Sequence, residues 1–132
     1  MSDPSSRYSL GMQTRRKVLG EHYVDAAVAD TTPFNAEFQA LITEAAWGSV
    51  WSRNTISLRD RSMLTVALLA AFGHYDELAM HVRATRNTGA SLDDIKEALL
   101  HVAIYAGVPA ANHAFKIVAN AYNDLTKEDN HA

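Results

Sequence analysis

His81 is the residue whose type and setting point most directly to chemistry. It lies between Leu78 and Val82 on the apolar stripe of an expected helix, and Glu77 precedes it by four residues, which is one helical turn. An imidazole titrates near neutral pH, so His81 suits a general acid or base, although the same setting also suits a buried, neutral histidine. A metal site is less favoured, because no third ligand stands near this pair and no H-E-x-x-H pattern occurs.

An acidic residue and two tryptophans form a second group. Glu44, Trp47 and Trp51 fall at positions i, i+3 and i+7, so they share one stripe of a helix beside an expected core stripe. That core stripe consists of Phe38, Leu41, Ile42 and Ala45. Tryptophans in this arrangement usually fill a core or an interface, but the aligned carboxylate also suits the wall of a pocket.

Arginines are the third group. Arg61 belongs to a cluster with Arg53 and Arg59, and Arg83 and Arg86 share a face of the helix that carries His81. Exposed arginines usually form weak surface pairs, but guanidinium groups with few carboxylates between them suit a small dianion. Because two residues span about 200° of an ideal helix, Arg83 points away from His81. A pocket holding both side chains would need a neighbouring subunit or a bent helix.

Composition limits the classes of function. The 132 residues suit one domain over 1–132, with 1–6 and 127–132 expected as flexible tails. The absence of cysteine excludes disulfides, thiolate metal sites and thiol nucleophiles, and a net charge of −3 argues against a nucleic-acid partner. No secretory signal, membrane span, nucleotide-binding glycine motif or serine-hydrolase motif is found. We therefore expect a cytoplasmic protein with no membrane or nucleic-acid partner.

The elements that must position these residues are helices alone. No run alternates as a strand does, and the glycines and prolines are taken to lie at the edges of periodic segments. Helices are expected over 8–19, 23–29, 34–51, 57–72, 75–88 and 93–106, with a last one after Pro109 that ends near Leu125. Ser91 and Asp94 form an expected capping box, and Gly89 an expected C-cap. The run 64–72 is apolar nearly all round, which predicts the centre of a bundle or a subunit interface.

Four segments resemble the carboxymuconolactone decarboxylase family: residues 44–51, 61–73, 81–89 (HVRATRNTG) and 102–112 (VAIYAGVPAAN). Residues 15–20 and 35–38 are also similar. The resemblance implies an all-α fold of the alkylhydroperoxidase-D type in a ring-like homo-oligomer, a hexamer or trimer. It also implies conversion of 4-carboxymuconolactone, a dicarboxylate lactone, to 3-oxoadipate enol-lactone and CO₂ with no cofactor. That reaction belongs to the protocatechuate branch of the β-ketoadipate pathway of aromatic catabolism. The peroxidase relatives carry a Cys-x-x-Cys that this chain lacks, so disulfide-based peroxide reduction is excluded.

For that reaction we expect His81 to donate the proton or to stabilise the enolate. Arg61, Arg83 and Arg86 would bind the substrate carboxylates, and Glu44, Trp47 and Trp51 would line the site, with Glu44 orienting an arginine. Two alternatives stay open: a non-catalytic binding or scaffolding homo-oligomer, and a decarboxylase of a related lactone or β-keto acid.

Overall fold

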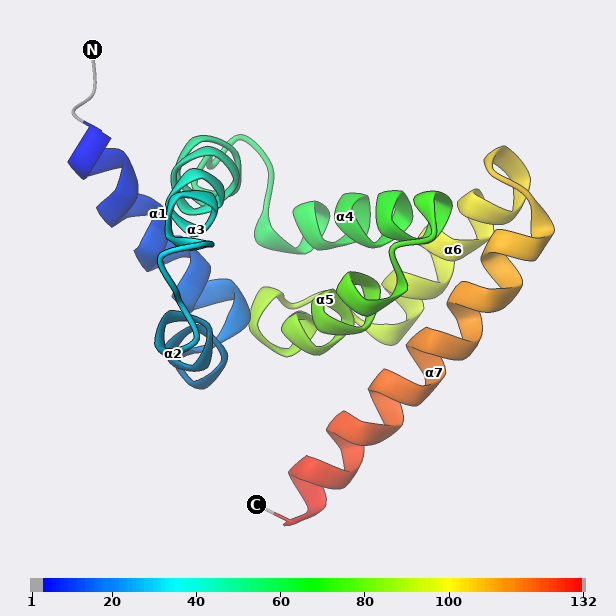
Figure 1. Cartoon of the computed structure of the whole chain (residues 1–132). Helices are drawn as coiled ribbons and strands as arrows, with labels where there is room; N and C mark the ends of the chain where they lie inside the picture. The colour runs from blue at the N-terminus through cyan, green and yellow to red at the C-terminus, as the bar shows by residue number, and fades with distance from the viewer. Residues whose placement is uncertain (1–3, 132) are drawn as a thin grey trace. The chain divides into compact units, whose positions relative to one another are not determined.

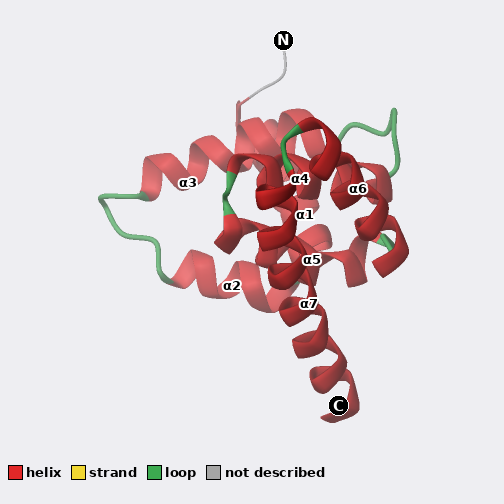
Figure 2. Ribbon diagram, turned by 90° about the vertical axis from the view of Figure 1, so that its right-hand side faces the viewer, coloured by secondary structure: helices red, strands yellow, loops and turns green. Residues whose placement is uncertain are grey.

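The computed structural model describes residues 4–131 and the side chains of residues 6–128. The fold is all-α, as predicted, and Figure 2 shows only helices and loops in this part of the chain. We expected one domain, and the internal contacts of the chain divide it into two compact units, Met1–Leu58 (unit 1) and Arg59–Ala132 (unit 2).

Unit 1 contains α1 (Pro4–Leu19), α2 (Glu21–Ala29), α3 (Ala36–Ile42) and a π-helix, η1 (Thr43–Trp51). α1 packs against both η1 and α2 (Figure 1). The sequence predicted one helix over 34–51. The structure divides it, because residues 43–51 form i→i+5 hydrogen bonds.

Two glycines allow the backbones of α1 and η1 to approach closely. A Cβ atom added at Gly11 would lie 2.0 Å from the carbonyl oxygen of Thr43, and one added at Gly48 would lie 2.6 Å from that of Arg7. Both glycines lie inside helices, so the expectation that glycines occur only at the edges of elements was wrong. Their role is close packing, for which a missing Cβ is required.

The predicted core stripe of this region was also wrong. Phe38 and Leu41 are 58% and 59% exposed, Ala45 is exposed and Ile42 is half-buried. The buried residues are instead Thr43, Trp47, Gly48 and Trp51. The wider winding of a π-helix changes which residues share a face, and α1 covers the face that carries these four.

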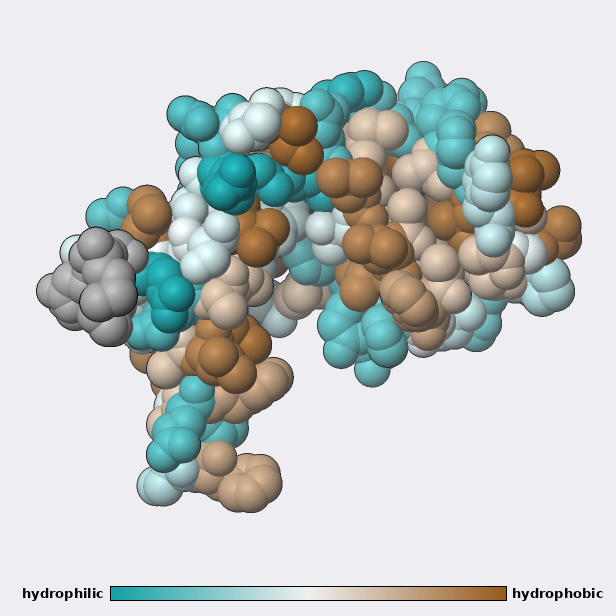
Figure 3. Space-filling model, turned by 90° about the horizontal axis from the view of Figure 1, so that it is seen from above, coloured by the Kyte–Doolittle hydropathy of each residue, from teal (hydrophilic) through white to brown (hydrophobic). Residues whose placement is uncertain are grey.

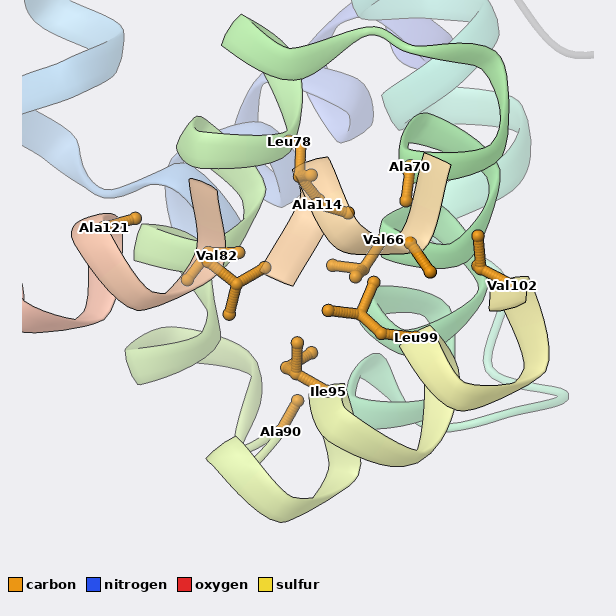
Figure 4. Packing of buried hydrophobic residues seen from close by; sticks show 12 residues of the cluster. Val66, Ala70, Leu78, Val82, Ala90, Ile95, Leu99, Val102, Ala114 and Ala121 are labelled. Carbon is orange, nitrogen blue, oxygen red and sulfur yellow. The ribbon is translucent and has the colours of Figure 1, made fainter. Parts of the chain in front are cut away.

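Unit 2 contains α4 (Leu58–Phe72, whose first residue closes unit 1), α5 (Tyr75–Thr88), α6 (Leu92–Tyr105) and α7 (Val108–His131). Their apolar faces meet in one core, where side chains of α4, α5, α6 and α7 converge (Figure 4). Members of this core include Val66, Leu78, Val82, Ile95, Leu99 and Ala114. Burial of these side chains supplies the main favourable term in folding.

The ends of α5 and α6 match the predicted signals. Gly89 has a left-handed φ of 87° and closes α5, and Ser91 and Asp94 form the capping box at the start of α6. α7 continues to His131, past the expected end near Leu125. Residues 4–6 and 127–131, which we expected to be tails, are therefore helical, and residues 1–3 and 132 lie outside the described part.

An ion pair joins the beginnings of α4 and α6. Nε and Nη2 of Arg59 donate to the two carboxylate oxygens of Asp94 at 2.8 and 2.6 Å, and these bonds hold the pKa of Asp94 well below its usual range. Arg59, grouped with the anion-binding arginines in the sequence, thus has a structural partner. None of the helices among residues 4–131 is both long and apolar enough to span a membrane.

Candidate active site

His81 lies on the buried face of α5 in unit 2. It is 7% exposed, and Leu78 and Val82 beside it are fully buried. The predicted apolar setting of this histidine is therefore confirmed.

Burial decides the protonation state of His81. Desolvation lowers its pKa to about 4, and the carboxylate of the exposed Glu77 raises it by a smaller amount. The side chain is therefore a neutral imidazole near neutral pH. A neutral imidazole has one N–H donor and one acceptor nitrogen, so it can donate a hydrogen bond to a developing oxyanion without carrying a charge.

Three buried hydroxyl groups accompany His81 in this otherwise apolar region. Ser62 of α4 donates to Oγ1 of Thr88 at 2.7 Å, and Thr85, one turn after His81, donates to the carbonyl oxygen of Val82 at 2.5 Å. Local hydrogen bonds thus occupy the hydroxyl protons of Ser62 and Thr85. Among the buried residues of α5, His81 is the one with an ionisable side chain.

The three predicted arginines occupy different settings in unit 2. Arg61 is half-buried on α4, whereas Arg83 and Arg86 lie exposed on α5, away from the face that buries His81. Arg86 pairs with Glu128 at 3.1 Å and lines a cavity of about 120 Å³, well below the volume of ordinary ligand pockets. The structure does not bring Arg83 and Arg86 to the His81 face.

Glu44, Trp47 and Trp51 lie on η1 in unit 1. The indole rings of Trp47 and Trp51 are buried, with their centroids 5.0 Å apart. Glu44 is half-buried, and its Oε2 accepts a hydrogen bond from Arg7 at 3.3 Å. The arginine that Glu44 contacts is Arg7 of α1, which is not one of the predicted site arginines.

Trp51 also lines a cavity of about 290 Å³ in unit 1. Lys17 and Arg53 line it as well, with small polar side chains and no carboxylate. A cavity with two cations and an aromatic wall suits a small organic anion. The sequence pointed to Trp51 and Arg53 but did not single out Lys17.

The sequence analysis also did not identify Arg15 as a buried cation. This arginine is 6% exposed in α1, on the buried face that carries Gly11 and Val18. Its spacing of four residues from Gly11 and three from Val18 was the available signal, because a cation at such a position is unusual.

The remaining described histidines offer less. His101 is exposed and interacts with the carbonyl oxygen of Glu97, and His113 stacks on Tyr75 with ring centroids 4.0 Å apart. Among the side chains that the structure describes, no three His, Asp or Glu groups cluster as metal ligands.

Comparison with known proteins identifies the family. Residues 36–120 match the model of the carboxymuconolactone decarboxylase family. The 4-carboxymuconolactone decarboxylase of Acinetobacter baylyi is 43% identical over 119 residues, 90% of this chain and 89% of that protein. The nitrosuccinic acid decarboxylase of Metarhizium robertsii is 39% identical over 115 residues, 87% of this chain and 80% of that protein. The chain is all-α, buries a neutral histidine and is similar to these relatives over nearly its whole length. It therefore belongs to the carboxymuconolactone decarboxylase family.

Proposed function

We propose that this protein decarboxylates 4-carboxymuconolactone to 3-oxoadipate enol-lactone and CO₂. The observation that carries the proposal is the 43% identity with the Acinetobacter baylyi enzyme, which extends over about nine tenths of both chains. The buried imidazole of His81 supplies a group suited to the chemistry.

The substrate itself can accept the electrons of the breaking bond. Its leaving carboxylate is vinylogously linked to the lactone carbonyl, so the electron pair of the C–CO₂ bond flows into a dienolate. The protein then has to hold a dianion, stabilise the enolate oxygen and return one proton to carbon. We propose that it does so without a cofactor.

Of the two roles expected for His81, we propose stabilisation of the enolate, because a neutral imidazole holds its N–H too tightly to transfer that proton to carbon. Because its pKa is about 4, the free enzyme presents a neutral N–H at neutral pH. A neutral donor stabilises charge as it develops on the lactone oxygen but attracts the ground-state carboxylates less than a cation does. Such an interaction strengthens in the transition state, which is what raises kcat.

The carboxylates of the substrate need cations. Arg61 is the better supported of the three predicted arginines, because it is half-buried, whereas Arg83 and Arg86 are exposed. Arg83 faces away from His81 within one chain, so its predicted role requires a neighbouring subunit. Trp47 and Trp51 would exclude water, and Glu44 would act through Arg7.

The relative from Metarhizium robertsii favours a second candidate, a decarboxylase of a related acid. Nitrosuccinic acid, named for that relative, also carries two carboxyl groups, and its nitro group can accept the electrons left by CO₂. A panel of the lactone, nitrosuccinate and a β-keto acid separates the two candidates by kcat/KM.

The proposed reaction is tested by CO₂ release from the lactone with purified protein. His81→Ala should lower kcat by about 10²-fold or more, the usual effect of removing a hydrogen-bond donor to a developing oxyanion. The matched control is His101→Ala, the same change at an exposed histidine of α6. Wild-type turnover in His81→Ala would remove the assignment of that residue. Binding of the lactone without CO₂ release would favour the non-catalytic alternative.

We also propose a homo-oligomer, a hexamer or trimer. Leu64, Leu68 and Phe72 of α4 lie at helical spacing and are 57%, 56% and 71% exposed. Figure 3 shows hydrophobic side chains gathered over this part of unit 2. An apolar stripe of this kind typically marks an interface. A cytoplasmic location stays a prediction, which cell fractionation would test.

A further inference from the structure

The structure gives the buried guanidinium group of Arg15 no acidic partner among the described side chains of unit 1. The Nη1 atom of Arg15 donates to Oγ1 of Thr43 at 3.4 Å, and Nη2 donates to Oε1 of Gln39 at 3.2 Å. Nε is buried and has no hydrogen-bond partner among the described residues. Every partner that the structure gives Arg15 is therefore neutral.

The neighbouring arginine shows the contrast. Arg16 is more exposed and forms ion pairs with Glu21 and Asp25 at 2.5 and 2.7 Å. The two acids of α2 thus compensate the more exposed cation, whereas no described side chain gives the buried one a counter-charge. Desolvation lowers the pKa of Arg15, but an arginine stays protonated in proteins. A buried charge in this state is unfavourable unless an anion joins it.

Arg15 lines a cavity of about 250 Å³, together with Gln39 and Thr43, the two residues that accept hydrogen bonds from its guanidinium. Gln39 and Thr43 provide polar groups in its wall, and Met12, Val28 and Ala40 provide apolar surface. None of its lining residues is acidic. Its volume lies just below the range of ordinary ligand pockets, so it suits only a small molecule.

We propose that this cavity is a binding site for a small organic acid, whose carboxylate pairs with Arg15 and whose carbon skeleton lies against the apolar wall. A carboxylate supplies the missing negative charge and accepts two parallel N–H bonds from a guanidinium. The Nε–H, which has no partner in the described structure, becomes one of the two donors. This inference does not depend on the proposed decarboxylation, and the substrate of that reaction is one acid that fits the description.

Removing Arg15 is the obvious test. Arg15→Met could fail to fold, however, because the side chain of Arg15 is buried where α1 packs against η1. Gln39→Glu avoids this problem, since it places a carboxylate beside Nη2 and compensates the charge from within the protein. The matched control is Gln13→Glu, the same change at the exposed glutamine of α1.

Calorimetric titration with adipate, succinate and benzoate measures binding, and adipamide serves as the uncharged probe. We expect wild type and Gln13→Glu to bind at least one of these acids and not adipamide. Gln39→Glu should bind the same acid at least tenfold more weakly and should unfold at a higher temperature. When the acid is added, the Nε–H signal of Arg15 in the NMR spectrum should shift in wild type and in Gln13→Glu. It should not shift in Gln39→Glu.

Three results would overturn the proposal. The first is that none of the acids binds to wild type. The second is that Gln39→Glu gains stability but binds the acid as wild type does, which would make Arg15 purely structural. The third is an Nε–H signal that responds to protein concentration and not to acid, which would assign the counter-charge to a second copy of the chain. Decarboxylation of the lactone is measured separately, so loss of the acid site and loss of the proposed function are distinguishable.

Discussion

Burial of His81 should make the folded protein less stable in mild acid. The pKa of this imidazole is 6.5 in the unfolded chain and about 4 in the folded one. Between these values the unfolded state binds a proton that the folded state does not, so the free energy of unfolding falls as pH falls. The full loss corresponds to about 3 kcal/mol, and the part between about pH 7 and pH 5 to about 2 kcal/mol.

Urea unfolding of wild type and His81→Gln across this pH range isolates the effect, because the other ionisable groups are common to both proteins. A change of about 2 kcal/mol moves the urea midpoint by about 1 M. We expect the midpoint of wild type to fall by that amount relative to His81→Gln on going from about pH 7 to pH 5. His101→Gln should follow wild type, since His101 is exposed. Parallel curves for wild type and His81→Gln would refute the argument that burial excludes the proton from His81.

Two further substitutions test the packing and the proposed assembly. Gly11→Ala should destabilise the protein by about 2 kcal/mol or more, because its Cβ would lie 2.0 Å from the backbone oxygen of Thr43; equal or higher stability in urea would contradict the close approach of α1 and η1. Leu68→Glu should dissociate the homo-oligomer in sedimentation velocity, whereas Leu10→Glu, at an exposed leucine of α1, should not. An unchanged assembly in Leu68→Glu would remove this face of α4 from the interface.

The sequence predicted unit 2 closely because local chemistry defines its helix ends. Gly89 adopts the left-handed conformation that side chains disfavour, and the Ser91 and Asp94 side chains bond back to the first turn of α6. Both signals act within a few residues, so the order of residues alone reveals them. The burial of His81 followed for the same reason, since the apolar neighbours that define its stripe lie on its own helix.

Unit 1 was predicted less well because its packing depends on contacts distant in sequence. The π-helical winding of residues 43–51 changes which side chains share a face of the helix. No local sequence pattern predicted this winding. Its packing against α1 requires Gly11 and Gly48 to meet residues about 30 to 40 positions away. The predicted stripe through Phe38 and Leu41 assumed an unbroken α-helix, so it assigned exposed side chains to the core.

The predicted site residues show the same contrast between signals that are local in sequence and contacts that are distant in sequence. His81 could be chosen from its helix alone, whereas the arginines were chosen by type, and type does not reveal a partner. Arg59 and Arg86 have carboxylate partners that lie 35 and 42 residues away. Arg15, to which the described side chains offer no carboxylate, was not singled out, because its neutral contacts with Gln39 and Thr43 exist only once α1, α3 and η1 have assembled.

Burial has opposite consequences for the two ionisable groups that these units enclose. His81 can release its proton, so its burial is accommodated by a lower pKa, and the result is a neutral donor whose state depends on pH only in acid. Arg15 cannot release its proton, so its burial leaves a permanent charge that an anion must compensate. The imidazole is therefore stable in its site without a ligand, whereas a bound anion would stabilise the guanidinium. For this reason, the arginine that the sequence did not single out supports a more specific prediction about ligand binding than the arginines that it did.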